Sequence, residues 1–436
     1  MLTVKCIERI RGRSRAIEFY KIQDMQGEQR VVTANQLKQA IRNKQVICSN
    51  LTLTSDNRLI GNVNKKSDNL DVQKLIIKAR ALGKSEIDYD NMTFVIQGNE
   101  ILLKSVNIKS GTVILPSFMS GYITTKEGQY NKACSPFENC IDIKVINNSQ
   151  ITTMQDLFQC TESLKELDLS NFDASRITSL SGAFNLSGVQ KIYFGNFNTS
   201  KVTDMSRMFK GCYGLENIDI KNFDTRNVEN MRGMFSYCKA PALNTVDLSY
   251  WNMGKVRNMS YMFNNCTAEK VILGKTSKKL TDVYAMFSHC NKLESVDLSR
   301  LNTQGVTDMS AMFCSCGSLK AVDLRNFSVG NVVTMRDMFK YCAMIKKLDL
   351  KSFHTYNLED AKNMFRDCIE LEELDISNFQ TSKLKDSSTM FMNCKSLITL
   401  NLPEKFFVPR EADRMFKGCY MLKFTDIDKD RFVKMQ

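Results

Sequence analysis

Cysteine is the first residue of this chain whose type and spacing could do chemistry. The sequence has 15 cysteines. Ten of them recur once per repeat at nearly the same position: Cys160, Cys212, Cys238, Cys266, Cys290, Cys316, Cys342, Cys368, Cys394 and Cys419. A zinc site needs tetrahedral sets of cysteine and histidine, and a row of single cysteines among Met and Phe does not form such sets. We therefore expect reduced thiols that pack as small apolar groups, without a bound metal.

Aspartate forms a second row, expected to point outward. Its members are Asp142, Asp168, Asp219, Asp247, Asp297, Asp323, Asp349, Asp375 and Asp426. Stacked carboxylates repel one another, so they could gather a cation such as calcium, or a basic partner. Alternatively, each could accept hydrogen bonds from nearby backbone and keep this surface soluble. For a partner-binding surface, the sequence predicts Asp219, Asp247, Asp297, Asp323, Asp349 and Asp375.

Catalytic patterns are scarce. The chain has only two histidines, His289 and His354, and they fall at different positions of the repeat. Gly274-Lys-Thr lacks the earlier glycine that a phosphate-binding loop requires. We therefore expect a protein that is not an enzyme, with no catalytic residues and no cofactor.

The element that must position these residues is a repeat of about 26 residues. Phenylalanine recurs along the chain at Phe158, Phe184, Phe209, Phe235, Phe263, Phe287, Phe313, Phe339, Phe365, Phe391 and Phe416. Such a period indicates stacked units that cover their apolar faces only by packing on their neighbours. The sequence therefore predicts a solenoid of about 11 repeats.

One unit shows the expected local structure. Met205, Met208, Phe209 and Cys212 are spaced i, i+3, i+4 and i+7, which predicts a short helix capped by Thr203. The following segment 215–223 alternates like a short strand, with Leu, Ile and Phe facing inward. We expect each unit to pair one short helix with one short parallel strand.

The text of the units resembles a known repeat family. Met-Phe-x-x-Cys-x-x-Leu-x-x-Leu-Asp-Leu-Ser-x-Phe-x-Thr is similar to the BspA-like leucine-rich repeats of bacterial surface proteins and mycoplasma lipoproteins. This resemblance implies a right-handed α/β solenoid of short parallel strands and short helices, with roles in adhesion or protein binding. Two units depart from the text, around Phe184 and around Phe263, where Val271-Ile-Leu-Gly-Lys-Thr replaces the usual Asp-Leu-Ser.

Four segments are expected along the chain. Residues 1–66 predict a small basic α+β domain, and residues 67–140 a helix that ends at Gly83 and strands, which connect it to the array and cap it. Residues 141–427 form the solenoid, whose first strand we place at Ile141 to Ile143, and residues 428–436 a charged tail. Residues 119–138 read as a loop. Trp251 replaces a repeat Phe and is expected in the core.

The chain carries a formal charge of +13, concentrated before residue 110, where 19 Lys and Arg face 11 Asp and Glu. The N-terminus has charges where a signal peptide needs an apolar run, and no wall anchor or membrane span is visible. These features favour a cytoplasmic protein.

Three functions remain open at this point. The first is a protein-binding scaffold that uses the strand-lined face of the solenoid. The second is nucleic-acid binding through a basic patch made of Arg9, Arg11, Arg13, Arg15, Arg42 and Lys44. The third is a surface adhesin exported by a non-standard route. The identity of the partner and the oligomeric state are left open by the sequence.

Overall fold

The structure is a computed structural model. It describes residues 2–11, 18–24, 29–43, 46–48, 52–53, 59–60, 77, 79, 81–97, 100–116, 119, 121–122, 125–127, 132–147, 151–216, 218–240, 244–406 and 414–423. The chain divides into two compact units, Met1–Ser85 and Glu86–Gln436. Each unit is described separately below.

The first unit contains a four-stranded sheet with the order β3-β2-β1-β4. Its elements are β1 (Leu2–Arg11), β2 (Glu18–Asp24), β3 (Gln29–Thr33), α1 (Ala34–Arg42), β4 (Val46–Cys48), β5 (Thr52–Leu53) and β6 (Leu59–Ile60). Strand β1 pairs antiparallel with β2 and parallel with β4. Ile22 of β2 and Leu37 of α1 are buried.

The helix expected to end at Gly83 lies mostly outside the described residues. Its described residues 77, 79 and 81 are helical. Gly83 has a φ of +64°, and the backbone N–H of Lys84 donates to the carbonyl of Ala79 over 2.8 Å. A left-handed glycine with such a hydrogen bond is a common helix ending, so the predicted end is confirmed.

The second unit begins with strands. They are β7 (Glu86–Tyr89), β8 (Met92–Gln97), β9 (Glu100–Val106), β10 (Ser110–Leu115), β11 (Gly121–Tyr122), β12 (Thr125–Glu127), β13 (Lys132–Cys134) and β14 (Asp142–Asn147). Four of them form the sheet β11-β9-β8-β7. Short strands β11, β12 and β13 lie in the segment 119–138, so the expectation of a plain loop there was wrong.

The parallel stack starts earlier than the sequence predicted. Strand β10 pairs in parallel with β14 along its whole length, with Val113 opposite Val145. Strand β14 in turn pairs with β15 (Glu166–Asp168), with Ile143 opposite Leu167. The strand at Ile141 to Ile143 is therefore the second member of the stack. The first, β10, lacks the Met-Phe text and was not recognisable by its period.

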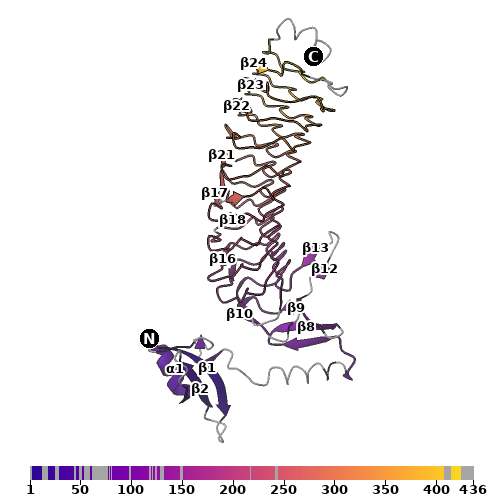
Figure 1. Ribbon diagram of the computed structural model, residues 1–436. Coiled ribbons are helices and arrows are strands. Elements are labelled where there is room, and N and C mark those ends of the chain that lie inside the picture. The colour runs from indigo at the N-terminus through magenta and orange to yellow at the C-terminus, as the bar shows by residue number, and fades with distance from the viewer. Residues whose placement is uncertain are drawn as a thin grey trace. The chain divides into compact units, whose positions relative to one another are not determined.

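The strands of the array are short and in register. They are β15, β16 (Lys191–Tyr193), β17 (Thr245–Asp247), β18 (Asn252–Met253), β19 (Lys270–Ile272), β20 (Lys275–Thr276), β21 (Ser295–Asp297), β22 (Lys347–Leu348), β23 (Glu373–Asp375) and β24 (Thr399–Asn401). Equivalent apolar residues face one another, as in Val246, Val271 and Val296. Figure 1 shows the successive coils from β10 to β24 stacked as a β-solenoid.

The short helices predicted around each Met-Phe pair are not formed. In the described part of the array these segments are runs of tight turns. The N–H of Met205 donates to the carbonyl of Asn230, and that of Phe209 to Met234, both in the next coil. An α-helix would instead pair each N–H with a carbonyl four residues earlier in its own segment. Bonding between coils therefore replaces bonding within a helix.

The predicted inward positions are nevertheless correct. Met205, Met208, Phe209 and Cys212 are each fully buried. A run of turns advances the chain so that the same spacing still points inward. The spacing of apolar residues thus predicted correctly which side chains are buried, but the backbone around them forms turns and not the predicted helix.

The core is built from two aromatic ladders. In the first, adjacent rings from Phe158 to Phe416 stack with centroids 5.3 to 5.8 Å apart. The second contains Phe172, Phe197, Phe223 and Trp251, and later Phe327, Phe353 and Phe379. Trp251 is buried in this ladder, as the sequence predicted.

The described helices include none with the length and apolar character that a membrane span requires. The predicted tail 428–436 lies outside the described residues.

Candidate functional site

The strand face, defined as the outward residues of the array strands, is the surface predicted to bind a partner. Of its predicted residues, Asp219, Asp247, Asp297, Asp323 and Asp349 are exposed and Asp375 is half-buried. Asp426 lies outside the described residues. Asp247, Asp297 and Asp375 are the last residues of strands β17, β21 and β23. Asp219, Asp323 and Asp349 lie at the same position of coils in which the strand is not formed or ends earlier, and we count them in the strand face. Ile272 interrupts the row between Asp247 and Asp297.

Most of these carboxylates already have a structural partner. Oδ1 of Asp247 accepts the backbone N–H of Ser249, and Asp297 and Asp375 make the same contact with Ser299 and Ser377, over 2.9 to 3.0 Å. Asp323 and Asp349 do likewise with the residue two positions on, over 3.1 and 3.2 Å. Each such bond closes the turn that follows a strand.

In Asp247, Asp297, Asp323 and Asp375 these contacts also lower the pKa of the carboxyl. The guanidinium of Arg325, which donates to Asp323 over 2.7 Å, brings the pKa of that carboxyl to about 2. Hydrogen bonds from Ser377 and Ser299 lower the pKa of Asp375 and Asp297. These four carboxyls are therefore ionised at neutral pH while they accept backbone hydrogen bonds, which fits the structural alternative raised by the sequence.

Basic residues on neighbouring coils balance the acidic ones. Lys144 pairs with Asp168 at 3.1 Å, and Lys347 pairs with Glu373 at 2.9 Å. Lys191 reaches Glu166 and Lys346 reaches Glu372 in the same way. Exposed pairs of this kind contribute little to stability, but they leave a surface of alternating charge. The strand face is consequently not a purely acidic surface.

The cysteine row lies inside the solenoid. Eight of its ten members are buried, and Cys160 and Cys419 are half-buried. Cys160 lies two residues after the phenylalanine of its unit, whereas the other nine lie three residues after it. Burial raises the pKa of the Cys342 thiol, whose Sγ donates to the carbonyl of Phe313 over 3.0 Å. The described cysteines are free thiols. Within the described residues, no cluster of His, Cys, Asp and Glu could hold a metal ion.

The basic patch is only partly described. Arg9 and Arg11 lie in β1, two residues apart, and Arg42 is exposed at the end of α1. Arg13, Arg15 and Lys44 lie outside the described residues. Whether these residues form one surface for nucleic acid stays a prediction.

The two histidines lie in different surroundings. His289 is in a turn with a φ of +60°, and the ring of His354 stacks with Tyr356 at 6.1 Å between centroids. They occur at different positions in the coils, so the structure does not bring them together in one repeated site.

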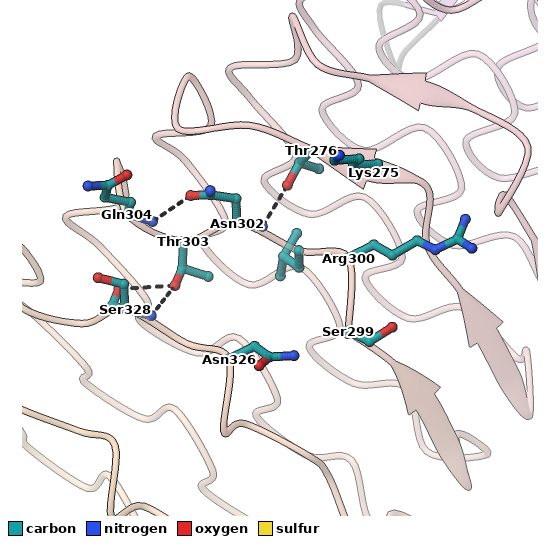
Figure 2. Close-up of a pocket in the computed structure, with 10 residues that line it drawn as sticks. Lys275, Thr276, Ser299, Arg300, Asn302, Thr303, Gln304, Asn326 and Ser328 are labelled. Atoms are coloured by element: carbon teal, nitrogen blue, oxygen red, sulfur yellow. Dashed lines mark hydrogen bonds between the residues drawn. The ribbon is translucent and has the colours of Figure 1, made fainter.

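A hollow of about 700 Å³ opens on the array between Lys275 and Ser328. We name it the corner hollow, because it lies directly after β19 and β21, where the chain leaves the strand face. Figure 2 shows Lys275 and Arg300 on one side of it and Thr303, Gln304 and Ser328 on the other. Lys275 belongs to the Gly274-Lys-Thr segment noted in the sequence, and the other four residues were not singled out from it.

The corner hollow coincides with a gap in the second aromatic ladder. Rings are present up to Trp251 and again from Phe327, and the two coils between them carry Gly274 and Leu301 at this position. The segment from Val271 to Asp282 is also one residue shorter than the segment from Val296 to Asp308, although both ends are in register. The irregular text after Phe263 was the sequence signal for this site.

One known protein family matches most of the array. Residues 128–191, 186–278 and 281–402 match the model described as "Mycoplasma protein of unknown function, DUF285". The chain belongs to this DUF285 family. No match was found among curated proteins. The matched ranges of the DUF285 model include the array strands and the corner hollow, and the family description itself names no function.

Proposed function

We propose that this DUF285 protein is a non-catalytic scaffold that binds a protein partner on its strand face. The observation that carries the proposal is the in-register stacking of equivalent residues, such as Lys347, Glu373 and Thr399, in successive coils. Such stacking makes a broad, rigid surface on which side chains of successive coils are aligned. The resemblance to BspA-like leucine-rich repeats favours the same role, with a cytoplasmic location as the expected one.

The acidic residues of the strand face can be tested without breaking its turns. Asn retains the Oδ1 atom that accepts the backbone N–H, but it removes the charge. A triple variant Asp323→Asn, Asp349→Asn and Asp375→Asn should therefore fold like the parent. We expect it to lose the protein partners that the parent captures from an extract of the native host.

A matched control removes charge from the array at a position outside the strand face. Glu229 and Glu359 pair with Arg257 and Lys385 on segments away from the strands, so the variant Glu229→Gln and Glu359→Gln should retain the partners. Quantitative mass spectrometry of the captured proteins compares the three samples. Equal capture by the parent and the triple variant would remove the aspartates from the binding surface.

A further inference from the structure

We propose that the corner hollow is a binding site for a small polyhydroxylated anion, one that carries a carboxylate or a phosphate group. This site is separate from the proposed protein-binding role and does not depend on it. The gap in the aromatic ladder supplies the space, and the side chains around it supply the chemistry.

The space arises because two coils lack the ring that their neighbours have. In the first of these coils the backbone at Gly274 packs directly on that of Trp251, where an added Cβ would meet the carbonyl oxygen at 2.3 Å, so this coil can carry no ring. In the second coil Leu301 takes the place of the ring, with 2% of its surface exposed. A leucine leaves more room than a phenyl ring, and the resulting volume of about 700 Å³ falls within the range of ligand pockets.

The charge of the lining favours an anion. Lys275 and Arg300 line the corner hollow, and its ten lining residues include no Asp or Glu. Nη1 of Arg300 donates to the carbonyl of Ser249 two coils earlier, over 3.1 Å, which holds the side chain across the shortened coil. Since a guanidinium has five N–H donors, this bond leaves others to meet an oxyanion.

The uncharged lining favours a ligand rich in hydroxyl groups. Amides come from Asn302, Gln304 and Asn326. Oδ1 of Asn302 accepts the N–H of Gln304 over 3.0 Å, so its Nδ2 group is the part that can donate elsewhere. Amide side chains beside hydroxyls offer both donors and acceptors, which suit the hydroxyls of a sugar.

The floor of the corner hollow is held rigid by hydrogen bonds between coils. The buried Thr276 accepts the N–H of Asn302 at Oγ1 over 2.7 Å. The buried Thr303 donates to the carbonyl of Ser328 and accepts its N–H, over 3.0 and 2.8 Å. A lining fixed in this way needs little reordering on binding, and such pre-organisation favours affinity.

The test measures binding of three sugars to the full chain by isothermal titration calorimetry and saturation-transfer NMR. Glucuronate presents a carboxylate, glucose 6-phosphate presents a phosphate, and glucose presents neither. We expect at least one of the two anions to bind, and glucose to bind at least about tenfold more weakly, because the charged hydrogen bonds are lost. Binding of one anion alone identifies which acid group the site prefers.

Two variants connect the binding to this site. Arg300→Gln should weaken the anion by about tenfold or more, and Leu301→Phe should abolish binding because its ring restores the ladder beside Phe327. Lys351→Gln removes an exposed cation outside the lining and should bind like the parent. The proposal is overturned if neither anion binds, if glucose binds equally well, or if Arg300→Gln binds like the parent.

Discussion

At the scale of single residues, pairs of residues with a left-handed φ set the course of the turns around each phenylalanine. Each described unit from Phe158 to Phe416 has a positive φ two residues before and two residues after the phenylalanine. Around Phe209 these are Arg207 at +55° and Gly211 at +68°. Residues other than glycine pay about 1–2 kcal/mol for this conformation. The stacked hydrogen bonds of the array must offset that cost at every coil.

Gly211→Ala tests this cost. The alanine would have to keep the left-handed φ of Gly211, and its Cβ would meet Cδ2 of Leu186 at 2.5 Å. We therefore expect a loss of about 1–2 kcal/mol in the free energy of unfolding. Gly317→Ala is the control, because its Cβ has nothing within 4 Å and its φ is not left-handed. Urea unfolding followed by circular dichroism compares the two midpoints. Equal midpoints would contradict the account of the turns.

At the scale of the elements, the buried cysteine row makes the stability of the array depend on pH. Burial raises the pKa of the thiol of Cys212 to about 12 and that of Cys266 to about 11. It also raises the pKa of Cys238, Cys290 and Cys316. In the unfolded chain these thiols titrate near pH 9, so above that pH the unfolded state holds fewer protons than the folded state.

Stability should therefore be complete below about pH 9 and fall as the pH rises through the folded values. Each thiol contributes up to about 1.4 kcal/mol per pH unit in that window. We expect the urea midpoint to drop steeply between about pH 9 and about pH 10.5, and less steeply in a Cys290→Ala, Cys316→Ala double variant. A midpoint that is flat over this window, or the same slope in both proteins, would show that the thiols are not protected by burial.

At the scale of the whole molecule, the array is a one-dimensional stack. Each coil donates backbone hydrogen bonds to the next, as Phe313 does to Met338 and Phe391 does to Met415. In such stacks stability is a sum of terms for each repeat and each interface. A defect should therefore matter according to its position in the array.

Removing one ring at two places tests this description. Phe313→Ala and Phe416→Ala each delete a buried side chain, at a cost of about 3–5 kcal/mol. We expect faster amide hydrogen exchange on both sides of Phe313 in the first variant, and only around the last described coil in the second. Mass spectrometry of peptic peptides locates the change. Uniform exchange along the array in the Phe416→Ala protein would instead indicate one cooperative block.

The sequence by itself determined the period, the inward residues and the stacked character of this protein. Burial depends on which side chains recur, and Phe209, Cys212 and their counterparts can be read directly. Only the tertiary structure decided that the segments around each Phe are turns, because their N–H groups donate to carbonyls in the next coil. The spacing of apolar residues along the sequence is the same for a helix and for these turns, so it could not distinguish them. The corner hollow was also decided by the tertiary structure, because it forms where the two coils between Trp251 and Phe327 lack an aromatic ring.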